Sequence, residues 1–256
     1  MLYNKSKEKW PQKQQIFETS DSIINPWEKN MTTLQVLHRD SLELGGFAGL
    51  REHRLVMDSK VFGHADSGAW SGIGNFVYLA DAKFVPNGET HLHPHKEIDV
   101  ISVIVDGRIS HEGTLEEGNV IETNQVQVQR AGSQGFAHNE VNPDDKENRM
   151  IQMWITPEKA GEPAGYKLYT LQQGKTIRVY GGSDNQDETF PSQTVLDVGL
   201  LKANQKITFD GEFIAYVTRG SGKLNGEKVS NGDLIRGNDI EFQSAEDTQI
   251  ILVRKI

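Results

Sequence analysis

The chain has 256 residues, of which 25% are charged and 36% hydrophobic, and its formal net charge is −9. These values are ordinary for a globular protein of one large or two modest domains. The acidic balance argues against direct nucleic-acid binding and against attachment to an anionic membrane, since both need a basic patch. No apolar run approaches about 18 residues, so we expect no membrane span. Cysteine is absent, so a metal site would need nitrogen and oxygen ligands.

The first 30 residues are polar and weakly patterned, and the stretch from Met1 to Gln15 carries lysine at positions 5, 7, 9 and 13. They lack the apolar core of a secretory signal. We interpret residues 1–30 as a polar N-terminal arm and expect a cytoplasmic protein.

From about residue 52 the chain consists of short apolar or alternating runs that predict β-strands. The clearest runs are residues 75–81, 98–105, 126–129 and 149–155. Turns are marked by glycine, as in Pro86-Asn87-Gly88 and Asp106-Gly107. Short strands at this spacing predict an all-β fold of the sandwich or barrel type, with few short helices.

The second half of the chain weakly repeats the pattern of the first. The run 213–217 leads to Gly220 much as the run 101–105 leads to Gly107. This similarity predicts two β-barrels from a duplicated unit.

We therefore expect a first domain over residues 31–157, a connector rich in proline and glycine over 158–184, and a second domain over 185–256. No histidine follows His138. Only the first domain can therefore hold a histidine-rich metal site, and we expect the second to be a structural or lid domain without one.

Four of the eight histidines lie in two short tracts, His91 to His95 and His138 to Glu140. On a strand, His93 and His95 project from the same face because side chains alternate with a period of two. A neighbouring strand carrying His138 and Glu140 would complete a site of three nitrogens and one oxygen, which suits Fe(II), Mn, Ni, Cu or Zn. The alternative is a solvated polar turn, since Pro94 interrupts strand pairing.

These tracts resemble known sequence motifs. The stretch from Gly88 to Gly107 looks like the first cupin motif, and the stretch from Gly118 to His138 is similar to the second. Within the cupins, HPHKEID at 93–99 and AGSQGFAHNE at 131–140 resemble the pirin family, whose pattern is HPH(R/K)xxE followed by AGxGIxHxE. The resemblance covers roughly residues 35 to 256.

The resemblance implies a bicupin, in which two cupin-type jelly-roll barrels follow one another. It implies that His93, His95, His138 and Glu140 hold one divalent metal, usually iron as Fe(II), with Mn, Ni, Co, Cu or Zn left open. Several members of the family open the flavonol quercetin with dioxygen, so the implied activity is that of a quercetin 2,3-dioxygenase-like oxidoreductase.

The chain departs from the family pattern in three places. Asp99 stands where glutamate is usual, the turn before His138 holds one extra residue at Ser133 or Gln134, and the N-terminal arm is longer. The first departure puts any supporting role of that carboxylate in doubt, and the second would shift His138.

The sequence leaves rival functions open. A metal-dependent binding or co-regulatory protein would act through contacts with a protein partner, and a non-oxidative cupin enzyme such as a sugar isomerase would need a hydrophilic pocket. The dioxygenase hypothesis requires a small aromatic substrate, O₂ and aromatic walls around the metal. It gives Glu140 a catalytic role as the base that removes a proton from the substrate. We expect a monomer.

The remaining candidates receive weaker assignments. We expect His91 at the barrel rim as a polar pocket residue, His111 exposed in a hairpin, and Phe136 at the pocket mouth. Trp70 is considered as a shield over the site, whereas Met153 and Trp154 are expected in the core. His38, His53 and His64 are given no role.

Overall fold

The computed structural model describes residues 34–115 and 118–256. The predicted arm, residues 1–30, lies outside the described residues. Within them the chain is built almost wholly of strands, with one 3-10 turn, η1 (Arg39–Ser41), and one short helix, α1 (Ser59–Phe62). The predicted all-β class is confirmed.

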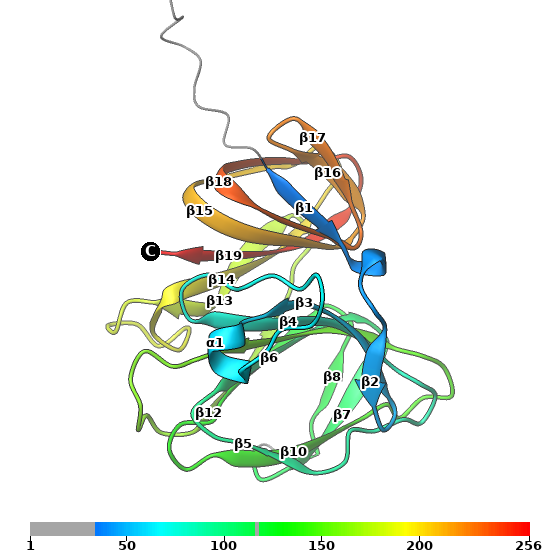
Figure 1. Cartoon of the computed structure of the whole chain (residues 1–256), viewed down its shortest axis with the longest axis vertical. Helices are drawn as coiled ribbons and strands as arrows, with labels where there is room; N and C mark the ends of the chain where they lie inside the picture. Colours follow the sequence, from blue (N-terminus) through cyan, green and yellow to red (C-terminus); the bar gives the residue numbers. More distant parts are fainter. Residues whose placement is uncertain (1–33, 116–117) are drawn as a thin grey trace, which may run out of the picture. The chain divides into compact units, whose positions relative to one another are not determined.

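Strands of the first half form two sheets (Figure 1). The larger has seven strands in the order β12 (Gly165–Thr170), β9 (Gln125–Arg130), β6 (Asp99–Asp106), β11 (Arg149–Ile155), β4 (Phe76–Phe84), β3 (Leu50–Met57) and β2 (Gly45–Phe47). The smaller has four strands in the order β5 (His93–His95), β10 (Phe136–Val141), β7 (Arg108–Gly113) and β8 (Val120–Glu122).

The second half forms one sheet of eight strands. Its order is β13 (Lys175–Gly182), β14 (Ser192–Leu201), β19 (Thr248–Lys255), β15 (Lys206–Arg219), β18 (Asp233–Ser244), β16 (Ser221–Leu224) and β17 (Glu227–Ser230), with β1 (Gln35–His38) paired to β18.

The seven-stranded sheet is the central layer, and its two faces differ. One hydrophobic cluster joins Val126 and Val128 of β9 to Val198 of β14 and Val253 of β19, so this face packs against the eight-stranded sheet. The other face turns toward the four-stranded sheet and closes the first barrel (Figure 1). Strands buried on both faces are expected to be rich in apolar residues, and β6 is apolar from Val100 to Val105 except at Ser102.

The interior of the first barrel is unusually polar at one end. Gln127 and Gln129 alternate along β9 with Val126 and Val128, the two valines that face the eight-stranded sheet. Both glutamines are fully buried. Ser102 of β6 and Gln152 of β11 lie in register with one another and are also buried. Buried polar side chains are costly unless they are hydrogen-bonded, so this interior indicates a built site rather than a simple core.

Gly113 is required where β7 pairs with β10. It stands opposite His138 and has a φ of 152°. A Cβ atom there would lie 2.1 Å from the carbonyl oxygen of Ala137. Because real Cβ atoms do not approach so closely, any larger residue would push β7 away from β10.

The predicted connector, residues 158–184, is not free of regular structure. It contains β12, which pairs with β9 of the first half, and β13, which pairs with β14 of the second. Conversely, β1 lies within the expected first domain but pairs with β18 of the second half. The proline and glycine residues therefore mark turns between edge strands, and the chain crosses between the sheets after β12.

Asp81 of β4 ties the two halves together. Its carboxylate accepts hydrogen bonds from Arg149 of β11, from Arg39 of η1 at 3.0 Å, and from the hydroxyl of Tyr216 on β15. The carboxylate is buried, with only 2% of its side chain exposed. Burial opposes ionisation, but Arg149 and the other donors outweigh it and hold the pKa of Asp81 below its ordinary value.

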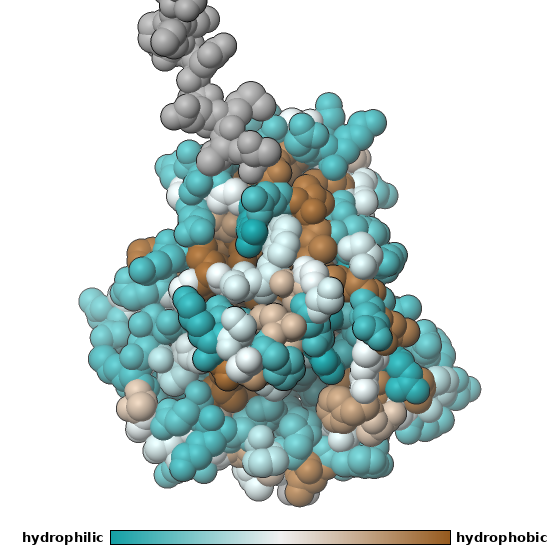
Figure 2. All heavy atoms as spheres, viewed as in Figure 1, coloured by the Kyte–Doolittle hydropathy of each residue, from teal (hydrophilic) through white to brown (hydrophobic). Residues whose placement is uncertain are grey.

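On the face shown in Figure 2, most of the surface is hydrophilic, in keeping with the net charge of −9. No helix in the described part of the chain combines the length and the apolar character needed to cross a membrane.

Asp81→Asn should destabilise the protein by about 3–5 kcal/mol, because it leaves buried guanidinium groups without their counter-charge. Since the folded-state pKa of Asp81 is lowered, its contribution is complete above the ordinary carboxylate pKa and is lost as the pH falls through the lowered value. Urea unfolding at pH 7 and at about pH 2, well below the ordinary carboxylate pKa, should therefore show a smaller acid-induced loss in Asp81→Asn than in wild type. The exposed Asp145→Asn should match wild type at both pH values, and equal acid sensitivity of wild type and Asp81→Asn would contradict the assignment.

Candidate metal centre

Strand pairing in the four-stranded sheet places the predicted ligands side by side. β5 and β10 run antiparallel, so that His138 stands opposite His93 and Phe136 stands opposite His95. His93 and His95 lie two residues apart on β5, as the period-two argument required. His138 is fully buried, His95 is 7% exposed and His93 is half-buried, which puts the cluster just inside the barrel mouth.

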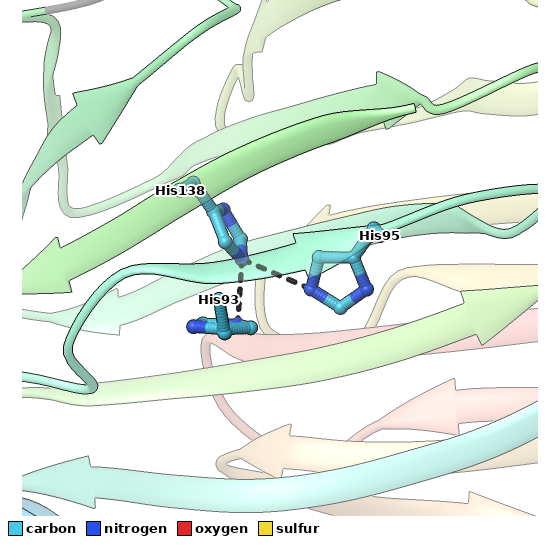
Figure 3. A group of neighbouring side chains, drawn as sticks. All are labelled: His93, His95 and His138. Carbon is cyan, nitrogen blue, oxygen red and sulfur yellow. Dashed lines mark hydrogen bonds between the residues drawn. The ribbon is translucent and has the colours of Figure 1, made fainter. Parts of the chain in front are cut away.

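The three imidazole rings turn their Nε2 atoms toward one another (Figure 3). Nε2 of His138 lies 3.0 Å from Nε2 of His93 and 3.1 Å from Nε2 of His95. One nitrogen from each ring falls within a group whose members are all within 4.8 Å of one another. A shared point of approach for three nitrogens is what a metal site needs.

The separations can be compared with those of coordinated imidazoles. Two ligands about 2.1 Å from an ion lie about 3.0 Å apart at right angles and about 3.4 Å apart at the tetrahedral angle. The distances of 3.0 and 3.1 Å from Nε2 of His138 to the other two Nε2 atoms agree with ligands at right angles. Three converging imidazole nitrogens would therefore suit a transition metal and would leave positions for further ligands.

The outer nitrogens of two rings have partners that fix the rings. Nδ1 of His93 lies 2.9 Å from the carbonyl oxygen of His91, so this nitrogen carries the proton and donates it. Nε2 of His93 is then unprotonated, as a metal ligand must be. His91 supplies this acceptor from a backbone with a φ of 64°. Nδ1 of His138 lies 3.0 Å from Nε2 of His111.

Electrostatics keep the buried rings neutral. Burial, helped by the neighbouring His93, lowers the pKa of His95 to about 4. Burial, followed by the three nearby histidines, lowers the pKa of His138 to about 2. Since a folded-state pKa below neutrality disfavours the imidazolium, both rings offer unprotonated nitrogen at pH 7.

Glu140 stands two residues beyond His138 on β10 but outside the group of three converging nitrogens. Its carboxylate accepts hydrogen bonds from Ser102 at 3.3 Å and from Gln152 at 3.1 Å. Burial raises the pKa of Glu140 to about 7, although both hydrogen bonds oppose this. The residue is 1% exposed and faces the barrel interior.

An aromatic wall, made of Phe62, Tyr78 and Trp154, adjoins the histidines. The Trp154 ring lies 5.4 Å from the His95 ring and 4.8 Å from that of Tyr78, and the Phe62 ring lies 5.7 Å from both of the other two. Such spacings are typical of packed aromatic groups. Phe136, expected at the pocket mouth, is buried and lies 5.2 Å from the His95 ring.

Beyond the wall lies a charged network. The Tyr78 hydroxyl donates to Glu52 at 2.9 Å, and Glu52 also accepts from Arg54 at 2.8 Å. Glu52 is 3% exposed, and Arg54 reaches Asp66 at the surface at 3.1 Å. One end of the aromatic wall is therefore anchored by a buried, compensated carboxylate.

Several sequence expectations need correction. His111 is not exposed: it is fully buried on β7 and contacts His138, because its strand faces the barrel interior. Trp70 does not shield the site; it bridges to Val56 on β3 and stacks under Arg236 of the second half. Met153 is in the core as expected, whereas Trp154 is only half-buried and borders the site.

Asp99, where the family has glutamate, points away from the metal centre. Its carboxylate accepts a hydrogen bond of 2.6 Å from Tyr180 on β13, across the seam between the halves. His91 exposes its ring and lies 3.6 Å from Glu89, so its contribution to the centre is its carbonyl oxygen.

Sequence reasoning missed Phe62, Tyr78, Gln129 and the role of His111. Tyr78 and Trp154 are direct register partners on β4 and β11, so a correct pairing of those two predicted strands would have found that contact. Phe62 comes from a helix and gave no strand-like signal.

Comparison with known proteins agrees with this geometry. The family model described as Pirin matches residues 62–155, a range that holds all the proposed ligands. A pirin-like protein from Caulobacter vibrioides is 28% identical over 186 residues, covering 68% of this chain and 80% of that protein. A quercetin 2,3-dioxygenase from Escherichia coli K12 is 25% identical over 172 residues, covering 62% and 73%.

Among solved structures, a bacterial pirin from Escherichia coli in complex with nickel(II) superposes with a TM-score of 0.74 at 17% identity, covering 86% of this chain and 98% of the other. The fold is that of the pirin-like bicupins. The resemblance to the pirin family that the sequence predicted is confirmed.

We expect His93→Ala and His138→Ala each to abolish stoichiometric metal binding while the fold persists. The reason is that the hydrophobic cluster between the seven-stranded and eight-stranded sheets, and not the metal, stabilises the fold. Metal analysis of the purified variants, with circular dichroism as the measure of folding, checks this. His64→Ala, at an exposed histidine outside the centre, is the matched control. Near wild-type metal content in either ligand variant would refute the assignment.

Proposed function

We propose that this protein is a metal-dependent dioxygenase of the pirin-like type that opens a flavonol such as quercetin with O₂, releasing carbon monoxide and a depside. The observation that carries the proposal is the meeting of three converging imidazole nitrogens with an aromatic wall at one barrel mouth. The similarity to proteins named quercetin 2,3-dioxygenase supports it.

His93, His95 and His138 would hold the metal, Fe(II) being our first choice, with Glu140 as a fourth ligand. When bound, such an ion supplies Lewis acidity toward a substrate hydroxyl and the redox capacity that O₂ chemistry requires. Three neutral imidazoles and one carboxylate would leave a site with a divalent ion at a net charge of about +1, which would favour an anionic oxygen of the substrate.

The aromatic wall would bind and orient the flavonol. Trp154 borders His95 directly, so a planar substrate stacked on its ring would have its polar edge near the three nitrogens. Phe136 on the other side of His95 would exclude water from the reacting end. A sugar isomerase would need hydrophilic walls at these positions, so the wall favours an aromatic substrate.

Glu140 would take the proton from the flavonol hydroxyl. It faces the barrel interior from the same side of β10 as His138, and Ser102 and Gln152 hold its two oxygens. A carboxylate held in this way beside the ligands is in place either to bind the metal or to receive a proton. Each oxygen accepts one hydrogen bond, from Ser102 or from Gln152, and so keeps a second lone pair for either role.

Glu140→Gln should retain some metal, because three imidazoles remain, but lose turnover by about 10²–10⁴-fold, since an amide cannot accept the proton. The loss should be partly relieved at high pH, where the flavonol ionises unaided. Oxygen uptake with quercetin, measured at several pH values on protein of known metal content, tests this. The exposed Glu147→Gln is the matched control.

Two outcomes would count against these assignments. A wild-type rate for metal-loaded Glu140→Gln at neutral pH would remove Glu140 as the base. No oxygen uptake by wild type with any flavonol, when fully loaded with Fe, Mn, Ni, Co or Cu, would sink the dioxygenase proposal and favour a co-regulatory or non-oxidative role.

Trp154→Leu should raise the KM for quercetin by about 3- to 10-fold, the equivalent of one lost aromatic contact, while metal content stays at the wild-type level. Steady-state oxygen uptake gives the KM. Trp70→Leu, at a tryptophan that packs against the second half, should leave the KM unchanged. An unchanged KM in Trp154→Leu would show that the substrate does not lie on this wall.

A further inference from the structure

We propose that His111 is a positioning residue for the metal centre: its Nε2 atom accepts the Nδ1 proton of His138 and so presents Nε2 of His138 to the metal. This inference rests on the proposed metal site, but not on the proposed dioxygenase reaction. It assigns a function to a buried histidine that belongs neither to the ligand set nor to the apolar core.

Geometry places His111 directly behind His138. The two residues lie on adjacent strands, β7 and β10, and the contact joins Nε2 of His111 to Nδ1 of His138 at 3.0 Å, an ordinary hydrogen-bond length. Nε2 of His138, on the opposite side of the ring, is the atom that faces His93 and His95. The two nitrogens of His138 therefore point to different partners.

The protonation pattern follows from this arrangement. A neutral imidazole has one protonated nitrogen and one with a lone pair. If Nε2 of His138 gives its lone pair to a metal, Nδ1 carries the proton and needs an acceptor. His111 supplies that acceptor when its own proton lies on Nδ1. A ligand ring held in this way has the right tautomer and orientation before the metal arrives.

His111 is itself held in place by buried amides. The amide of Gln127 donates to the side-chain oxygen of Gln129 at 2.9 Å, which turns the amide nitrogen of Gln129 toward Nε2 of His111 at 3.0 Å. Nε2 of His111 therefore faces two donors, this amide and Nδ1 of His138, which share its single lone pair and require it to be unprotonated. All three side chains are fully buried. Farther along β7, Ile109 occupies the corresponding interior position and belongs to an apolar cluster, so the fold does not itself demand a polar residue at position 111.

The Nδ1 atoms of His93 and His138 have different kinds of partner. His93 has its Nδ1 fixed by a backbone carbonyl, which substitution of a side chain cannot remove. His138 depends on a side chain for the same purpose, and this makes the role of His111 accessible to mutation. Removal of such a partner typically weakens metal binding by about 10- to 100-fold.

The test compares two substitutions at position 111. His111→Leu removes the acceptor, and His111→Gln keeps a carbonyl oxygen near the place of Nε2. The Ni(II) dissociation constant of each is measured by competition with a chromophoric chelator, and metal-free unfolding is followed in parallel. We expect His111→Leu to bind Ni(II) about 10- to 100-fold more weakly than wild type, and His111→Gln to stay within about threefold.

Wild-type affinity in a folded His111→Leu would overturn the proposal, as would an equal loss in both variants. A second test, which does not depend on the stability of His111→Leu, is ¹⁵N NMR of the Zn(II)-loaded wild type. We expect a proton on Nδ1 of His138 and an unprotonated, hydrogen-bonded Nε2 on His111. A proton on Nε2 of His111 would refute the inference with no variant involved, because that atom could not then accept from His138.

Failure of this inference can be told apart from failure of the proposed function. If wild type binds no Ni(II) or Zn(II) stoichiometrically, the metal centre itself is wrong and the inference fails with it. If the metal binds and the His111 variants behave as expected while quercetin consumes no oxygen, the positioning role stands and the dioxygenase proposal does not.

Discussion

The antiparallel register of β10 is the constraint on which the candidate site depends. Pairing with β5 sets His138 opposite His93, and pairing with β7 sets Gly113 opposite His138 and His111 opposite Glu140. A shift by one residue would turn every side chain of β10 to the other face of the sheet. Gly113 protects this register, because a Cβ atom there would collide with the backbone of β10.

The two faces of the central sheet have different roles. Its face toward the second half carries the branched aliphatic side chains of the largest hydrophobic cluster, and the buried Asp81 links both halves within the same layer. Its other face carries Ser102, Gln127, Gln129 and Gln152, which line the barrel near the histidines. The far end of this face is again apolar, with Phe84, Ile104 and Met150 packed against Ile109 of β7. Because apolar packing fills the rest of the sheet, the polar groups near the histidines can be set out for ligand and substrate binding at modest cost to folding.

Residues outside the proposed ligand set orient the ligands of the candidate metal centre. Three nitrogens define where the ion would lie, but the carbonyl of His91 and the ring of His111 decide which nitrogen of each ligand faces it. The aromatic wall then limits what can approach. These contacts come from α1, β4, β5, β7, β10 and β11 together, so the chemistry depends on the whole barrel rather than on any one motif.

The sequence alone determined the strand-rich class, the placement of His93 and His95 on one face, and the lack of histidine in the second half. These features follow from local periodicity and composition, which a strand imposes on its own residues. It singled out His138 as part of a second histidine–carboxylate tract, which the family resemblance supported, but it misplaced His111 and Trp154. The tertiary structure decided those positions, as well as the wall of Phe62 and Tyr78 and the strands inside the expected connector. The physical reason is that a period of two says which residues share a face, but not which strand lies across from it, since long-range register is set by packing over the whole barrel.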